Sequence, residues 1–246
     1  MRYLILSDLH ANWHALDAVL RASEGQYDQV LCCGDLVGYG PDPNAVTEWA
    51  RAHCAVVVRG NHDRSCTGLD SLEWFNPVAR LAALWTQREL TAANADYIRA
   101  LPKGPLLVGN FELVHGAPYD EDDYVMGSSE AAQAFGYLER RVVFFGHTHT
   151  QGGFIWNHSR VESISRTPLR RDTLTFSIDP ECAYLINPGS VGQPRDGDPR
   201  AASALYDSAV QEVTLRRTEY DVAAVQKLIR ESGLPPVLAD RLAAGR

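Results

Sequence analysis

Seven side chains that can bind a metal ion lie beside short apolar runs in the first 150 residues of the chain. One tetrahedral structural zinc is saturated by four ligands. Seven donors therefore favour two divalent cations that share one carboxylate, and a single structural metal is the alternative interpretation. The donors are two carboxylates, one amide and four imidazoles: Asp8, His10, Asp35, Asn61, His115, His147 and His149.

The segment VVFFGHTHT, residues 142 to 150, runs from large apolar residues into two histidines one residue apart. Because alternate side chains of an extended strand point to the same side, we expect His147 and His149 to project together from the end of a buried strand. The same spacing relates Asp8 to His10. In the alternative interpretation, one histidine packs in the core and the other is solvated.

Two divalent cations with nitrogen and oxygen donors are suited to the hydrolysis of phosphate esters. Such a centre activates water to hydroxide near neutral pH and assists in-line displacement at phosphorus. The leaving oxygen needs a proton, and His62, next to Asn61, is the candidate general acid, a role that contributes about 10²–10⁴-fold. The mixed donors favour Mn, Fe, Zn, Ni or Co over Mg and Ca, and we expect Mn to support activity best.

Six apolar segments lead into the clusters that carry these residues. Short apolar strands buried on both faces are typical of α/β proteins. Ligands of such folds bind outside the carboxyl ends of the strands, so we expect the six clusters to meet at one shared site. The segments are YLILSDLH, VLCCGD, AVVVRGNHD, ELVHG, VVFFGHTH and YLINPGS.

Helix signals separate the first strands, and strand signals dominate the second half of the chain. The segments LLVGNFEL and FIWNHSRVESI carry the turn residues of hairpins, so several antiparallel strands are expected there. Five helices are predicted from an asparagine cap, an initial proline or a helical spacing of apolar residues: one from Asn12, and others at 43–53, 77–90, 221–232 and 236–244.

No segment has the Gly, Ser or Pro content of a linker between domains. We therefore expect a single domain over residues 1–246, with a helical insertion at 64–103 and C-terminal helices at 221–244. Its architecture is expected to be two packed sheets with helices outside.

The composition is that of a folded, acidic protein. The net charge of −8, without a basic stripe, argues against general nucleic-acid binding and against anionic membrane surfaces. Five cysteines, odd in number and not spaced as CxxC, are typical of reduced thiols in a cytoplasmic protein. We see no signal peptide, and no segment approaches the ~20 apolar residues that cross a bilayer.

The ordered series DLH, GD, GNHD, HG and GHTH resembles the calcineurin-like metallophosphoesterase superfamily, over roughly residues 1 to 217. The fold of that family is α/β with four αββα layers, two packed mixed β-sheets flanked by helices, which agrees with the pattern above. The resemblance implies that Asp35 bridges two metals and that His62 is the catalytic histidine. It assigns the first metal to Asp8, His10, Asp35 and His149, and the second to Asp35, Asn61, His115 and His147.

The stretch GDLVGYG departs from one branch of that family. Serine/threonine phosphatases of the superfamily carry GDxVDRG, and this chain has Gly38 and Tyr39 in place of the Asp and Arg. The missing arginine argues against a dedicated protein phosphatase, and the chain looks more like small bacterial phosphoesterases. Arg195 and Arg64 are candidates to bind the substrate phosphate instead, because arginine favours bidentate phosphate contacts.

Three further segments flank the predicted site. The NPGS turn is expected to have a structural role with indirect contact to the metals. The acidic run at 120–123 is expected to be a solvated loop, or, if it faces the pocket, to repel long polyanions. Trp74 and Phe75 precede a helix and are expected to pack as a hydrophobic staple and not to stack on a nucleobase.

These features together predict a dinuclear phosphoesterase that hydrolyses a phosphate mono- or diester by attack of metal-bound hydroxide. A small-molecule or nucleotide substrate is expected. The alternatives are a dinucleoside polyphosphate hydrolase, a protein phosphatase and a non-catalytic metal-binding scaffold. A scaffold would be expected to lose donors or the acid, and this chain keeps the whole set.

Overall fold

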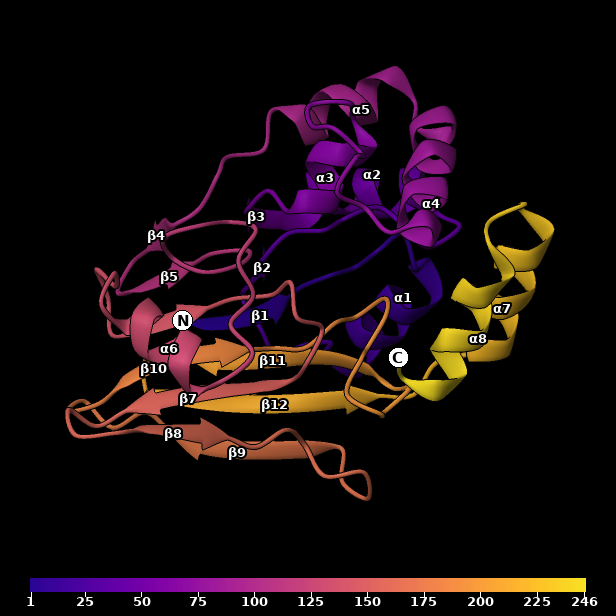
Figure 1. The fold of residues 1–246 in the computed structure, drawn as a ribbon. Coiled ribbons are helices and arrows are strands. Elements are labelled where there is room, and N and C mark those ends of the chain that lie inside the picture. Colours follow the sequence, from indigo (N-terminus) through magenta and orange to yellow (C-terminus); the bar gives the residue numbers. More distant parts are fainter.

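A computed structural model describes residues 1–246. Two six-stranded mixed sheets pack face to face, and helices cover their outer sides (Figure 1). This arrangement confirms the α/β fold with four αββα layers.

The first sheet contains the N-terminal strands of the chain. Its strand order is β3-β2-β1-β11-β12-β9, and β1, β2 and β3 run parallel while the other pairings are antiparallel. Its strands are β1 (Arg2–Leu6), β2 (Gln29–Cys32), β3 (Cys54–Val57), β9 (Thr173–Ser177), β11 (Ala201–Asp207) and β12 (Glu212–Thr218).

The second sheet has the order β4-β5-β6-β10-β7-β8. Here β5, β6 and β10 run parallel, whereas β4, β7 and β8 pair antiparallel with their neighbours. Its strands are β4 (Leu106–Val108), β5 (Phe111–Leu113), β6 (Val142–Phe144), β7 (Gly152–Trp156), β8 (Val161–Ile164) and β10 (Ala183–Asn187).

Each sheet therefore contains one trio of parallel strands, and the six predicted polar clusters follow the carboxyl ends of these six strands. The face-to-face packing brings the two sets of carboxyl ends together. Buried aromatic side chains fix this packing: Phe111 of β5 lies edge-on to Tyr206 of β11, with ring centroids 5.3 Å apart. The sheet interface thus positions the loops that carry the candidate site.

The five predicted helices are all present, with ends that differ by at most a few residues. Side-chain caps explain two of the starts, because Asn12 accepts from the Ala15 N–H and Asn76 from the Ala79 N–H. No helix has both the length and the apolar character that a bilayer crossing requires. The helices are α1 (Trp13–Ala22), α2 (Pro43–His53), α3 (Asn61–Cys66), α4 (Pro77–Glu89), α5 (Ala92–Arg99), α6 (Ser128–Phe135), α7 (Val222–Glu231) and α8 (Pro236–Ala244).

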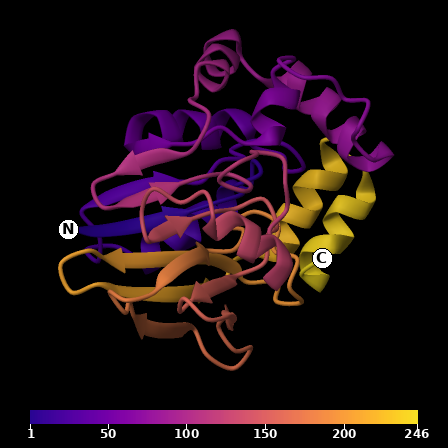
Figure 2. The ribbon, with the colours of Figure 1, turned by 60° about the vertical axis from the view of Figure 1, so that its left-hand side comes forward.

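Three helices, α3, α5 and α6, were not among those predicted. Of these, α3 matters most for the site, because it begins at Asn61 and carries His62 on its first turn. The C-terminal helices α7 and α8 pack beside α4, which Figures 1 and 2 show as yellow helices next to a magenta one. Their apolar side chains cover Tyr39, a residue of the loop after β2.

Candidate metal centre

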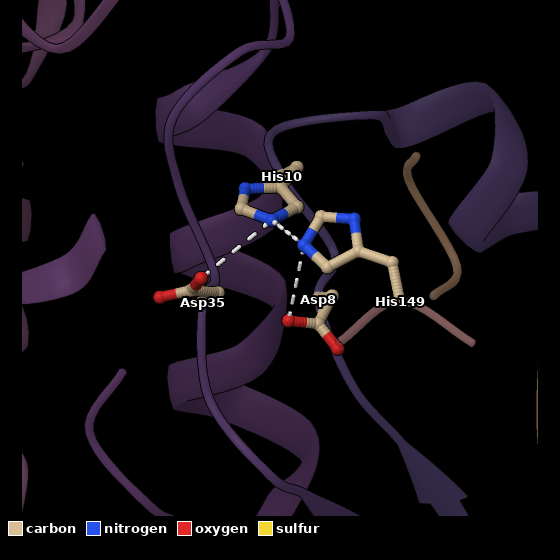
Figure 3. A group of neighbouring side chains, drawn as sticks. All are labelled: Asp8, His10, Asp35 and His149. Atoms are coloured by element: carbon tan, nitrogen blue, oxygen red, sulfur yellow. Dashed lines mark hydrogen bonds and ion pairs between the residues drawn. The ribbon is translucent and has the colours of Figure 1, made fainter. Parts of the chain in front are cut away.

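The structure brings the seven predicted donors together at the carboxyl ends of the two parallel trios. One group consists of Asp8, His10, Asp35 and His149, all buried (Figure 3). A second group adds His115 and His147 around the same Asp35. The donor atoms within each group lie within 4.8 Å of one another.

In the first group, two imidazoles face each other between two carboxylates. Nε2 of His10 lies 3.0 Å from Nε2 of His149. Oδ2 of Asp35 is 3.6 Å from the His10 nitrogen, and Oδ1 of Asp8 is 3.5 Å from the His149 nitrogen. Figure 3 shows all four side chains pointing toward this common space.

The second group repeats this arrangement on the other side of Asp35. Nε2 of His115 lies 3.5 Å from Oδ2 of Asp35, 3.2 Å from Nδ1 of His147 and 3.2 Å from Oδ1 of Asn61. One oxygen of Asp35 is therefore directed at both groups. This is the position that the sequence resemblance implies for a bridging carboxylate.

Backbone carbonyls fix the tautomers of the four imidazoles. Nδ1 of His10, His115 and His149 each donates to a carbonyl oxygen, so Nε2 carries the lone pair. His147 is reversed, because its Nε2 donates to the Asp122 carbonyl and its Nδ1 faces His115. All four rings thus present an unprotonated nitrogen to the centre.

The loops that carry the donors have a left-handed backbone, which corrects the prediction from strand spacing. β6 ends at Phe144, and His147 and His149 have φ values of +65° and +57°. In this conformation residues two apart do not share a side, and the two imidazoles enter different groups. Asp8 and His10 also have positive φ, at +53° and +44°, although both belong to the first group.

Non-glycine residues in this conformation cost about 1–2 kcal/mol each. Hydrogen bonds within the buried loops offset the cost: the Asp8 N–H donates to the Gly34 carbonyl at 2.9 Å, and the His10 N–H donates to the Asp35 carbonyl at 3.0 Å. Four of the candidate donors, Asp8, His10, His147 and His149, and the shared Asp35 all have this strained backbone.

Burial raises the pKa of both carboxyl groups. Burial raises the pKa of Asp8 to about 7. The pKa of Asp35 rises well above its usual value, because burial and then the nearby Asp63 carboxylate disfavour its charged form. Oδ2 of Asp35 has no hydrogen-bond partner. A buried carboxylate oxygen without a donor is costly unless a cation binds it.

Asp63 supports this arrangement, and no feature of the sequence pattern singled it out beyond its place in GNHD. Its buried carboxylate accepts from the backbone N–H groups of Asp35, Leu36 and Gly60 at 2.9, 2.9 and 3.0 Å. It thereby joins the loop after β2 to the start of α3. Gly60 permits the close approach, since a Cβ there would lie 2.1 Å from Oδ1 of Asp35.

The NPGS turn holds the donor loops without entering either donor group. Asn187 donates to the Gly146 carbonyl, Ser190 donates to the Asp8 carbonyl, and the Gln193 carbonyl accepts from His149. This is the indirect structural contact that was predicted for the turn.

These observations fit a pair of cations. Two unprotonated nitrogens that face each other at 3.0 Å repel unless a positive charge lies between them. Donors that share a cation at about 2.1 Å lie about 3 Å apart, which matches the separations in both groups. The N/O donor set also suits first-row transition metals.

His62 is buried beside the first group, with its ring centroid 5.0 Å from that of His10. Its backbone N–H donates to Oδ1 of Asp35, and its Nδ1 has no partner. Burial, followed by the influence of His10 and Arg195, lowers the pKa of its imidazole well below the usual value. The ring is therefore neutral before a substrate binds.

The departure at GDLVGYG is explained by the packing of His62. A Cβ on Gly38, whose φ is +90°, would lie 2.5 Å from Nδ1 of His62. The Tyr39 ring packs on the other side of the cluster, 4.4 Å from the His62 ring and 4.8 Å from the His10 ring. Gly38 and Tyr39 thus shape the space that the histidine occupies.

The two predicted phosphate-binding arginines lie in different surroundings. The guanidinium of Arg195 lies over the Tyr39 ring, 5.5 Å from its centroid, and donates to Gln193. It is therefore near the position of the arginine that the serine/threonine branch has. Arg64 is instead bonded to Glu121 and Asp122 at 2.8 and 2.6 Å, with Asp70 at 3.3 Å.

Two expectations about the mouth of the site were wrong in part. Phe75 packs as expected, against His62 and two core clusters, but Trp74 is 92% exposed because it turns away from that packing. In the acidic run, Asp122 is exposed as a solvated loop would be. Glu121, however, is buried, because Arg59 and Arg64 pair with its carboxylate.

Comparison with known proteins gives a consistent result. Residues 1–209 match the model of the calcineurin-like phosphoesterase superfamily domain. The chain is 32% identical over 257 residues to the uncharacterized protein MJ0912 of Methanocaldococcus jannaschii, which covers 98% of this chain and 97% of that protein.

Solved structures agree with this match. The crystal structure of a metallophosphoesterase from Sphaerobacter thermophilus is similar with a TM-score of 0.88 and 39% identity, over 100% of this chain and 99% of that chain. The hypothetical protein PH1004 from Pyrococcus horikoshii OT3 has a TM-score of 0.77 at 18% identity, over 100% and 98% of the two chains. The latter likeness extends to the fold alone.

Proposed function

Because the chain belongs to the calcineurin-like phosphoesterase superfamily, we propose that it is a metal-dependent hydrolase of phosphate mono- or diesters. Its substrate is a small molecule or a nucleotide. The observation that carries the proposal is the unpaired Oδ2 of Asp35, which lies between two buried groups of unprotonated nitrogens.

In this proposal, Asp35 belongs to both metal sites. Two divalent cations, with Mn favoured and Fe, Zn, Ni and Co compatible, would supply an activated water and would neutralise the phosphoryl oxygens. Asp8, His10, Asp35 and His149 would hold the first, and Asp35, Asn61, His115 and His147 the second.

His62 is proposed to protonate the leaving oxygen. Its ring is fixed between Tyr39 and Phe75, and its Nδ1 is free of other partners. The neutral ring must gain a proton before it can donate one. The negative charge of a bound phosphate ester favours that protonation, because an opposite charge nearby raises the pKa of an imidazole.

Arg195 is proposed to bind a phosphoryl oxygen of the substrate. Its guanidinium is half-buried above Tyr39, and Gln193 orients it. A planar guanidinium can make two parallel hydrogen bonds to phosphate. Arg64 is a weaker candidate for this role, because three carboxylates already surround it.

Metal removal and restoration test the proposal. Chelation should abolish hydrolysis of a chromogenic phosphomonoester or diester, and Mn²⁺ should restore it, with two ions per chain by elemental analysis. Asp35→Asn should lower kcat by more than about 100-fold and reduce the bound metal, because it removes a charge that both groups use. Asp17→Asn, an exposed carboxylate on α1, is the matched control.

Two results would contradict the proposal. A chain that binds two ions and hydrolyses no ester with any of the five metals would be a scaffold and not an enzyme. A stoichiometry of one ion, unchanged by Asp35→Asn, would instead indicate a single structural metal.

A further inference from the structure

Trp74 is the most exposed large hydrophobic side chain of the molecule, at 92%. The next residue, Phe75, is packed against His62 and the core, so the segment itself is anchored. An exposed indole on an anchored segment exposes much apolar area without a packing benefit. A binding role explains why this ring faces solvent.

The Trp74 side chain lines a pocket of about 290 Å³ that adjoins the candidate metal centre. Asn61 and His147 belong both to the wall of this pocket and to the second donor group. If the phosphate of a ligand lies at the candidate metal centre, this pocket is therefore the space beside the organic group attached to that phosphate. Its volume is close to the lower end of the range for small-molecule sites, so it suits a compact group such as a planar ring.

A second aromatic side chain of the wall is already held in place. The Tyr124 ring stacks on His147, with centroids 3.8 Å apart and an interplanar angle of 27°. Tyr124 itself is half-exposed, at 49%. Trp74 and Tyr124 thus give the pocket two large aromatic surfaces, which planar rings use for stacking.

The polar groups of the pocket suit the edge of a heterocycle better than a plain hydrocarbon ring. Asp70 and Asp122 contribute carboxylates, and Ser71 contributes a hydroxyl. Arg64 pairs with both carboxylates, so the wall offers hydrogen-bond acceptors and one of its two negative charges is offset. Aromatic surfaces with polar groups at their edge are the features that bind nucleobases.

We infer that this pocket binds the nucleobase of a nucleotide substrate, with Trp74 as its stacking surface. The inference rests on the proposed function, because it places the phosphate of the same ligand at the metal centre. It narrows the substrate class from phosphate esters in general to nucleotide esters. Trp74 is a specificity residue that touches the base, not the reacting atoms.

A displacement assay tests the inference without relying on turnover. The fluorescent nucleotide 2-aminopurine riboside 5′-monophosphate is quenched when its base stacks, so its binding to Mn²⁺-loaded protein can be followed by stopped flow before hydrolysis. Adenosine 5′-monophosphate and ribose 5-phosphate are then compared as competitors. They carry the same phosphate, and only one of them carries a base.

The base should strengthen competition by about tenfold or more, the contribution typical of one stacked base. Trp74→Ala should remove the quenching, and direct calorimetric titration of the two competitors should then give equal affinities. Trp74→Phe should keep most of the difference, because a ring remains. Leu81→Ala, which changes an exposed apolar side chain on α4 outside the pocket, should match the parent protein.

Three results would overturn the inference. Equal competition by the two compounds in the parent protein would show that the pocket does not bind the base. An unchanged difference in Trp74→Ala would place the base elsewhere. A dimer in sedimentation that Trp74→Ala dissociates would show that a second copy of the chain covers the indole. Failure of the proposed function can be told apart from failure of this inference. A protein that hydrolyses no ester would refute the proposed function, but the binding of the two competitors could still be compared.

Discussion

The floor of the candidate site, formed by the loops at residues 7–10, 33–36, 60–63, 115 and 147–149, is almost entirely buried, whereas the rim, formed by residues 70–75 and 120–124, is largely exposed. In the floor, donors are held by short hydrogen bonds to backbone groups. In the rim, ion pairs at the surface, such as Arg64 with Asp122, hold the segments together.

This contrast assigns different tasks to the two regions. A buried, hydrogen-bonded floor keeps charged and strained groups in one geometry, as metal chemistry requires. An exposed rim held by surface ion pairs contributes little to stability, so its side chains can vary with the substrate. Under the proposed function, the floor therefore supplies the groups for the reaction, and the rim is the region that contacts the rest of the ester.

The floor and the rim should differ most in the loss of stability and of Mn²⁺ affinity when a carboxylate that accepts hydrogen bonds is removed. Asp63→Ala leaves three buried N–H groups in the floor without an acceptor, at about 1–3 kcal/mol each. We expect the free energy of unfolding to fall by about 3 kcal/mol or more, and the Mn²⁺ affinity to fall by about 10–100-fold. Chemical denaturation and calorimetry measure the two effects.

The matched rim variant is Asp122→Ala. Its carboxylate also accepts a hydrogen bond, from Arg64, but its side chain is 50% exposed. The free energy of unfolding should change by less than about 0.5 kcal/mol. If the two variants were equally stable, the distinction between floor and rim would be wrong.

The same contrast describes what was predictable from the sequence. The donors of the floor follow apolar strands in a fixed order, and a buried strand that ends in Asp, Asn or His leaves a recognisable pattern. The seven candidate donors were selected in this way, and six of them lie in two adjoining buried groups, with Asn61 beside His115 of the second. The two packed sheets and the five predicted helices followed from the same alternation of apolar runs and caps, whereas the order of strands within each sheet was not predicted.

Three features of the site were not predictable from local sequence. The left-handed backbone at His147 and His149 depends on hydrogen bonds from other loops, and the preference of histidine for this conformation is too weak to predict it. The role of Asp63 depends on the juxtaposition of the β2 loop with α3. The exposure of Trp74 depends on the direction in which its segment leaves the core.

A change of pH is expected to have an intermediate effect, and the quantity that it changes is the affinity of the floor for Mn²⁺. In the metal-free protein, burial raises the pKa of Asp8 to about 7, so below that pH a cation must displace a proton from its carboxyl group. Burial lowers the pKa of His10 and His149 well below the usual value and that of His147 to about 2, so these rings are neutral and do not compete.

Displacement of the Asp8 proton should therefore make the Mn²⁺ affinity rise by about tenfold per pH unit up to about pH 7, in addition to any proton displaced from Asp35. Calorimetric titrations in two buffers with different ionisation enthalpies will give both the affinity and the proton release. Asp8→Asn should bind more weakly, and the slope of its affinity with pH should be smaller by about one proton. An affinity that is independent of pH between about 6 and 7 would contradict the assignment of a protonated Asp8.

The smallest effect is expected at Arg64, whose guanidinium joins α3 to the acidic loop of the rim. If it braces the loop, Arg64→Ala should raise KM by only a few-fold and leave kcat and metal content unchanged, as expected for a partly exposed ion pair. Glu121→Ala, which removes its buried partner, should then have the same small effect. If Arg64 binds the substrate phosphate instead, the two variants should differ, because Glu121→Ala frees the arginine and lowers KM while Arg64→Ala raises it. Steady-state kinetics of the two variants on one ester therefore determine whether Arg64 contacts the substrate phosphate or only holds the acidic loop in place.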